Sequence, residues 1–130
     1  MKYLGIDYGA KRVGVAVSNS EGTIAFPRMT ISNDGKLLDV LKQLIADEHI
    51  ESVAVGDTRA FSGHENPVTK DLERFIERLK TETTLPIIAA HEAGSSIEAS
   101  RYAEKGNEHD DAAAAAIILQ RYLDMQGTRE

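Results

Sequence analysis

The sequence predicts an α/β fold built on a mixed five-stranded sheet, and three observations support this. Two short apolar runs, 3–6 and 13–17, flank a glycine-containing turn, a pattern typical of a β-hairpin. Two further runs, 52–56 and 86–90, are nearly all apolar, like strands buried on both faces of a parallel sheet. Segments with helical spacing lie between and after these runs. This order predicts antiparallel strands one to three, then parallel βα units, with helices on both faces.

The predicted hairpin places a carboxylate at the end of its first strand. The apolar run stops at Asp7, and a turn through Gly9 and Lys11 leads into the second strand. A charge at the end of a buried strand costs free energy unless water, a metal ion or another partner contacts it. Aspartate is also common in ordinary turns, so Asp7 alone leaves both interpretations open.

The next segment predicts an edge strand followed by a helix. Residues 23–32 are rich in β-forming side chains but contain Pro27, which fits an edge strand or a bulge better than a central strand. Asn33 and Asp34 can then cap a helix that reaches about Glu48. The apolar stripe of this helix is formed by Leu37, Leu38, Leu41, Leu44 and Ile45.

The second half of the chain predicts three more helices. A polar loop at 57–66 is followed by Pro67, which fits the first position of a helix that runs to about Thr83. A short helix is expected at 97–104, and a last helix opens at 110–111. One face of the last helix carries Asp111, Ala115, Ile118, Leu119 and Tyr122.

The length and composition narrow the class of protein. The 130 residues predict a single domain, 1–130, and the absence of cysteine excludes disulfides and thiolate metal sites. No apolar run reaches the length of a membrane span and no export signal is recognised, so we expect no membrane partner and a cytoplasmic location. The net charge of −6 argues against a broad basic face for nucleic acid, although a local basic patch or bridging metal ions stay possible.

Three acidic residues stand out by their positions. Asp7 and Glu92 follow strands whose carboxyl ends form the rim where such sheets bind ligands. Asp111 lies on the apolar face of the last helix, so packing of that helix would bring it to the same rim. Clustered carboxylates need hard cations or a shared proton, and Mg²⁺ or Mn²⁺ suits oxygen ligands. Pairs of such ions support phosphodiester cleavage. The alternative is a helix-terminal Asp111 and a solvated Glu92, and spacing does not choose between them.

Two segments resemble one protein family. GIDYGAKRVGVAVS, residues 5–18, resembles the opening motif of the YqgF family, and DAAAAAIILQRYLD, residues 111–124, resembles its closing helix. These small bacterial proteins have an RNase H-like fold and are described as Holliday junction resolvases and as nucleases that mature the end of pre-16S rRNA. The resemblance implies an RNase H-like nuclease domain. Its acidic triad would be Asp7, Glu92 and Asp111.

The middle of the chain departs from the family pattern. The family usually carries Asp-Glu-Arg-Leu-Thr-Thr where residues 91–96 read His-Glu-Ala-Gly-Ser-Ser. Glu92 is kept, whereas the arginine, a plausible phosphate contact, is replaced by Ala93. His91 could act as an additional metal ligand or a general base, or it could be an ordinary loop histidine.

Basic residues next to Asp7 suggest how a substrate would be held. Lys11 and Arg12 lie in the first turn and could contact a phosphate backbone, the alternative being a solvated turn. Together with the acidic triad, the resemblance to the YqgF family implies an Mg²⁺- or Mn²⁺-dependent endonuclease that processes the 5′ end of pre-16S rRNA, and this is the function we expect. The alternatives are a Holliday junction resolvase acting on branched DNA and a non-catalytic nucleic-acid-binding or ribosome-assembly factor. Nothing in the sequence marks a dimer face, so a monomer or weak homodimer is expected.

Overall fold

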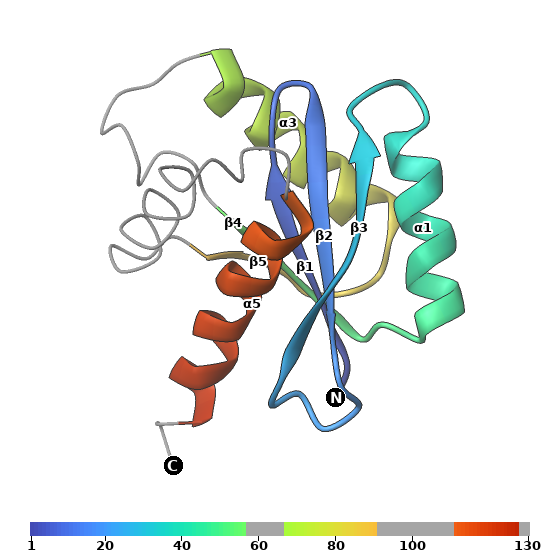
Figure 1. Ribbon diagram of the computed structural model, residues 1–130. Coiled ribbons are helices and arrows are strands. Elements are labelled where there is room, and N and C mark those ends of the chain that lie inside the picture. Colours follow the sequence, from blue (N-terminus) through green and yellow to red (C-terminus); the bar gives the residue numbers. More distant parts are fainter. Residues whose placement is uncertain (57–66, 91–110, 128–130) are drawn as a thin grey trace.

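The computed structural model describes residues 1–56, 67–90 and 111–127 (Figure 1). Its strands are β1 (Tyr3–Tyr8), β2 (Arg12–Ser18), β3 (Ala25–Ser32), β4 (Ser52–Gly56) and β5 (Ile87–Ala90). Its helices are α1 (Leu37–Glu48), α3 (Pro67–Glu82) and α5 (Asp111–Gly127). The predicted loop at 57–66 and the predicted helix at 97–104 lie outside the described residues. Within the described ranges, no helix is both long enough and apolar enough to cross a bilayer.

The five strands form one mixed sheet in the order β3-β2-β1-β4-β5. β1 and β3 pair antiparallel with β2, whereas β4 pairs parallel with both β1 and β5. The predicted mixed sheet and its edge strand are therefore confirmed. The register between β2 and β3 shifts at the proline, since Val15 lies opposite Met29 and Ala16 lies opposite Pro27. This irregularity accommodates a residue that has no N–H to donate.

The two faces of the sheet carry different cores. Figure 1 shows α5 across one face and α3 behind the other. The core against α1 and α3 is large and includes Leu4, Ile6, Val13, Val15, Val53, Val55, Leu41, Leu72 and Leu79. The core against α5 is made of Tyr3, Ala16, Ala54, Ala115, Leu119 and Leu123. Because successive strand residues face opposite sides of the sheet, Tyr3, Gly5 and Asp7 of β1 lie on the face that α5 covers.

Small residues on the α5 face let this helix approach the strands closely. A Cβ atom added at Gly5 would lie 2.6 Å from the Cβ of Leu119. A Cβ atom at Gly14 would overlap the backbone carbonyl of Asp111, and one at Gly56 would lie 2.6 Å from the Cδ1 of Ile118. The close packing of α5 on the sheet therefore depends on glycine at these three positions.

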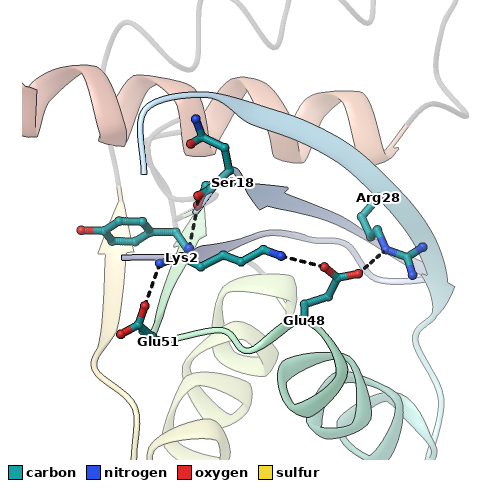
Figure 2. A network of polar contacts seen from close by, with 7 residues as sticks. Lys2, Ser18, Arg28, Glu48 and Glu51 are labelled. Atoms are coloured by element: carbon teal, nitrogen blue, oxygen red, sulfur yellow. Dashed lines mark hydrogen bonds and ion pairs between the residues drawn. The ribbon is translucent and has the colours of Figure 1, made fainter. Parts of the chain in front are cut away.

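A polar network joins the elements at the end of the sheet where β1 begins (Figure 2). The Nζ of Lys2 lies 3.0 Å from Oε1 of Glu48, and the Nε of Arg28 lies 3.1 Å from its Oε2. These two hydrogen bonds hold the pKa of the Glu48 carboxyl below its usual value. Nearby, the buried Ser18 hydroxyl accepts a 2.8 Å hydrogen bond from the backbone N–H of Tyr3. Together these contacts tie β1, β2, β3 and the end of α1 to one another.

The start of the first helix differs from the prediction. α1 begins at Leu37, and its N-cap, Lys36, makes no side-chain capping hydrogen bond. Asp34 instead accepts two hydrogen bonds just before the helix, from the N–H of Lys36 at Oδ1 (2.9 Å) and from the N–H of Leu37 at its carbonyl (3.1 Å). The predicted cap at Asn33 and Asp34 is therefore wrong, because Asp34 builds a turn that precedes the helix.

Several strand boundaries also differ. β2 is one residue longer at each end than the predicted run 13–17, because Arg12 and Ser18 pair with β3, so Arg12 lies in the strand and not in the first turn. β5 begins at Ile87, one residue later than predicted.

β1 continues through Asp7 to Tyr8, because both residues pair with β2 across the sheet. β3 begins at Ala25, two residues later than predicted, because Asn19 binds the N–H groups of Thr23 and Ile24 within the preceding turn.

The close approach of α5 predicts a packing cost for added volume at Gly5. We expect Gly5→Ala to lower the free energy of unfolding by about 1–3 kcal/mol, since the new methyl group must displace Leu119. Gly35→Ala is the matched control, because a Cβ there meets nothing within 4 Å. Urea denaturation of both variants measures the difference. Equal stabilities would contradict this description of the interface.

Candidate functional site

Asp7 and Asp111 meet at one rim of the sheet, although they lie near opposite ends of the chain. Asp7 projects from the α5 face of β1 and is paired across the sheet with Gly14 of β2. The first turn of α5 sits directly on Gly14, where an added Cβ would lie 2.9 Å from the Cβ of Asp111. The glycine therefore brings the Asp111 carboxylate to the strand end that carries Asp7.

The environment of Asp7 disfavours its charge. The side chain is partly buried beneath the start of α5. Desolvation by this burial, followed by the negative charge of Asp111, raises the pKa of the Asp7 carboxyl to about 7. Two carboxylates placed in this way favour either a shared proton or a bound cation. The pair is thus suited to holding a positive ion at neutral pH.

Arg12 connects the hairpin to the last helix. Its Nε donates a 2.9 Å hydrogen bond to Oδ2 of Asp111, and the ion pair spans 99 positions of the sequence. The Arg12 side chain remains 45% exposed, compared with 21% for Asp111, so its outer face is open to a ligand. Lys11 is exposed in the adjoining turn. Two cations therefore border the acidic pair.

The structure brings together four of the five residues predicted for the site. Asp7, Lys11, Arg12 and Asp111 share one rim, whereas Glu92 lies outside the described residues, as does His91 beside it. No group of three or more His, Asp or Glu side chains able to hold a metal occurs within the described ranges. The roles assigned to these five residues stay predictions.

Two features of the site are absent from the predictions made from the sequence. The pairing of Arg12 with Asp111 was not foreseen, because Arg12 was expected to contact phosphate alone. The role of Gly14 was also missed. The alternation of Gly14 and Ala16 along one face of a strand, together with the alanines at 112–116, was the available signal for a close helix–sheet contact.

The chain matches known proteins along nearly its whole length. A family described as "RuvX: Holliday junction resolvase" matches residues 1–125. A protein of Nitratidesulfovibrio vulgaris is 38% identical over 128 residues, which span 97% of this chain and 86% of that protein. A protein of Thermoanaerobacter pseudethanolicus is 35% identical over 136 residues, which span 97% of this chain and 98% of that protein. Both relatives carry the name "Putative pre-16S rRNA nuclease".

Solved structures with the same fold include two of Thermus thermophilus RuvC. One, in complex with a Holliday junction substrate, has a TM-score of 0.66 at 17% identity and covers 97% of this chain and 96% of that chain. The other has a TM-score of 0.63 at 16% identity and covers 98% and 97%. At these identities the likeness concerns the fold alone, and it confirms the predicted RNase H-like α/β architecture.

The raised pKa of Asp7 predicts a pH-dependent cost in stability. Between about pH 4 and pH 7 the folded protein retains the Asp7 proton that the unfolded chain releases, so stability falls as the pH rises. In EDTA at pH 8 we expect Asp7→Asn to raise the free energy of unfolding by about 2 kcal/mol, with the gain shrinking toward pH 4. Urea denaturation between pH 4 and pH 8 measures this change in the free energy of unfolding. Asp71→Asn, at an exposed position, is the control. A gain independent of pH would contradict the assignment.

Proposed function

Because the chain belongs to the RuvX (YqgF) family, as its terminal motifs predict, we propose that it is a metal-dependent endonuclease that hydrolyses phosphodiester bonds in structured nucleic acid. The observation that carries this proposal is the meeting of Asp7 and Asp111 over Gly14, at the end of β1. Sheets of this kind bind ligands at the carboxyl ends of their strands, and the acidic pair lies at such an end.

The donor set at this rim fits a hard divalent cation. Asp7 and Asp111 offer carboxylate oxygens, and their mutual repulsion contributes to the raised pKa of Asp7. A cation between them would replace the proton and favour both charges. We propose Mg²⁺ or Mn²⁺ held by Asp7, Asp111 and Glu92. A bound ion of this kind would supply Lewis-acid chemistry to phosphodiester hydrolysis.

The neighbouring cations are proposed to hold the substrate. Lys11 is exposed at the turn and can contact a backbone phosphate as a point charge. Arg12 uses Nε to hold the Asp111 carboxylate, which leaves its terminal nitrogens to face a second anion. Arg12 would then orient a proposed metal ligand and a phosphate at the same time.

Precursor 16S rRNA is the substrate we propose first, with cleavage near its 5′ end in the cytoplasm. The names of the relatives support this choice, since the two that are matched over most of their length both carry the name "Putative pre-16S rRNA nuclease". A Holliday junction is the second candidate because the matching family is described as a resolvase. A monomer or weak homodimer would suit the first substrate, whereas resolution of a four-way junction calls for a symmetric dimer.

Cleavage assays with variants of the acidic pair test the proposal. In Mg²⁺ or Mn²⁺ the wild type should cut a labelled 16S precursor fragment in preference to a labelled four-way DNA junction. Asp7→Asn and Asp111→Asn should each slow cleavage by about 100-fold or more, because each removes a proposed metal ligand.

A surface variant serves as the control for this assay, and two outcomes would refute the proposal. Asp71→Asn removes a carboxylate from the exposed surface of α3 and should cut like the wild type. Failure of the wild type to cut either substrate, or full activity in both site variants, would refute the nuclease proposal. Binding of one substrate without cleavage would favour the non-catalytic binding factor instead.

A further inference from the structure

We propose that Asn33 is a positioning residue that holds the turn carrying Lys11, and leading into Arg12, in the direction required for phosphate binding. This inference rests on the proposed function, because it concerns how the substrate contacts of that same site are set. Asn33 follows the last residue of the edge strand β3 and belongs to neither the acidic pair nor the cationic turn.

The turn in question, residues 9–11, is short and exposed. It joins β1 to β2 between the paired residues Tyr8 and Val13, and its two last residues are exposed to solvent. The chain folds back tightly here, since a Cβ atom at Gly9 would lie 2.5 Å from the backbone oxygen of Arg12. No large apolar side chain lies within residues 9–11 to anchor them to either core. Polar contacts must therefore restrain the turn.

Asn33 supplies two such contacts. Its side-chain Nδ2 donates a 2.7 Å hydrogen bond to the carbonyl of Gly9, and its backbone N–H donates a 2.9 Å hydrogen bond to the carbonyl of Lys11. The two acceptors lie on either side of Ala10. Asn33 thus binds both ends of the turn. Its partly buried side-chain amide donates a hydrogen bond to the Gly9 carbonyl, which would otherwise lose a partner.

The hydrogen bonds of Asn33 also restrain residues of the candidate site. Lys11 accepts one of the two hydrogen bonds through its own carbonyl, and Arg12 pairs across the sheet with Ser32, the residue before Asn33. Arg12 in turn holds Asp111 at 2.9 Å. A turn fixed in advance loses less conformational freedom when it binds a phosphate, which favours affinity.

Asn19 provides a matched comparison within the same chain. It lies in the turn between β2 and β3, at the opposite end of the sheet from Asp7. Its Oδ1 accepts hydrogen bonds from the N–H groups of Thr23 (2.8 Å) and Ile24 (3.1 Å). Asn19 therefore stabilises a turn as Asn33 does, but without contact to the cationic residues.

The test compares Asn33→Ala with Asn19→Ala. Binding of a labelled 16S precursor fragment and of a labelled four-way junction is measured by anisotropy in EDTA, and cleavage is measured in Mg²⁺. We expect Asn33→Ala to weaken binding about fivefold, the loss of one hydrogen bond, and to raise KM more than it lowers kcat. Asn19→Ala should change binding less than about twofold, whatever its effect on the thermal midpoint. Asn33→Ser serves in place of Asn33→Ala if the latter unfolds.

A double-mutant cycle with Lys11→Ala separates positioning from general stability. Lys11→Ala should weaken binding and lower the salt slope by about 1, and adding Asn33→Ala should then weaken binding less than about twofold further. If Asn33→Ala binds no worse than Asn19→Ala while Lys11→Ala binds weakly, the inference is overturned and the proposed function stands. If Lys11→Ala binds like the wild type, the proposed phosphate contact is wrong and the inference fails with it.

Discussion

The contact of α5 with β2 at Gly14 is the constraint on which the candidate site depends. Asp7 is fixed in the sheet by its pairing with Gly14, whereas Asp111 is fixed by where the first turn of α5 rests and by its 2.9 Å hydrogen bond from Arg12. A side chain at position 14 would displace the helix and separate the two carboxylates. The small residues of this sheet face therefore serve the geometry of the acidic pair as well as the packing of the core, in which Ala16 and Ala115 lie fully buried.

The two ends of the sheet have opposite electrostatic properties. At the end where β1 begins, Lys2 and Arg28 lower the pKa of Glu48, so this carboxylate stabilises the fold above its ordinary pKa and the contribution is lost on acidification. At the other end, burial and Asp111 raise the pKa of Asp7, so ionisation of Asp7 costs stability toward neutral pH. Perturbed pKa values of this kind are common where a fold holds groups for a ligand.

The sequence was sufficient for the features that depend on local pattern. Alternation and apolar runs predicted the mixed sheet, Pro27 predicted the irregular edge strand, and the apolar stripe of the last helix predicted its packing on the sheet. Contacts between residues far apart in the sequence could not be predicted in this way. Nothing near Arg12 in the sequence indicates a partner 99 positions away, and nothing near Gly14 identifies the first turn of α5 as its neighbour. Asn-Asp before an apolar stripe predicts a helix cap at Asn33, whereas the Asn33 amide donates a hydrogen bond to the Gly9 carbonyl of another turn.

If the protein binds nucleic acid as proposed, its net charge of −6 makes the direction of the turn at residues 9–11 important for binding. An acidic protein gains little from long-range attraction to a phosphate backbone, so its affinity must come from a few cations at fixed positions. Lys11 and Arg12 are the cations that we propose for this role, and the acidic pair beside them would repel a phosphate unless a bound ion compensated its charge. Metal binding and substrate binding are therefore expected to favour each other, because each neutralises charge that opposes the other. In such a site a small shift of the turn changes the balance between attraction and repulsion, which makes its restraint by Asn33 a determinant of affinity.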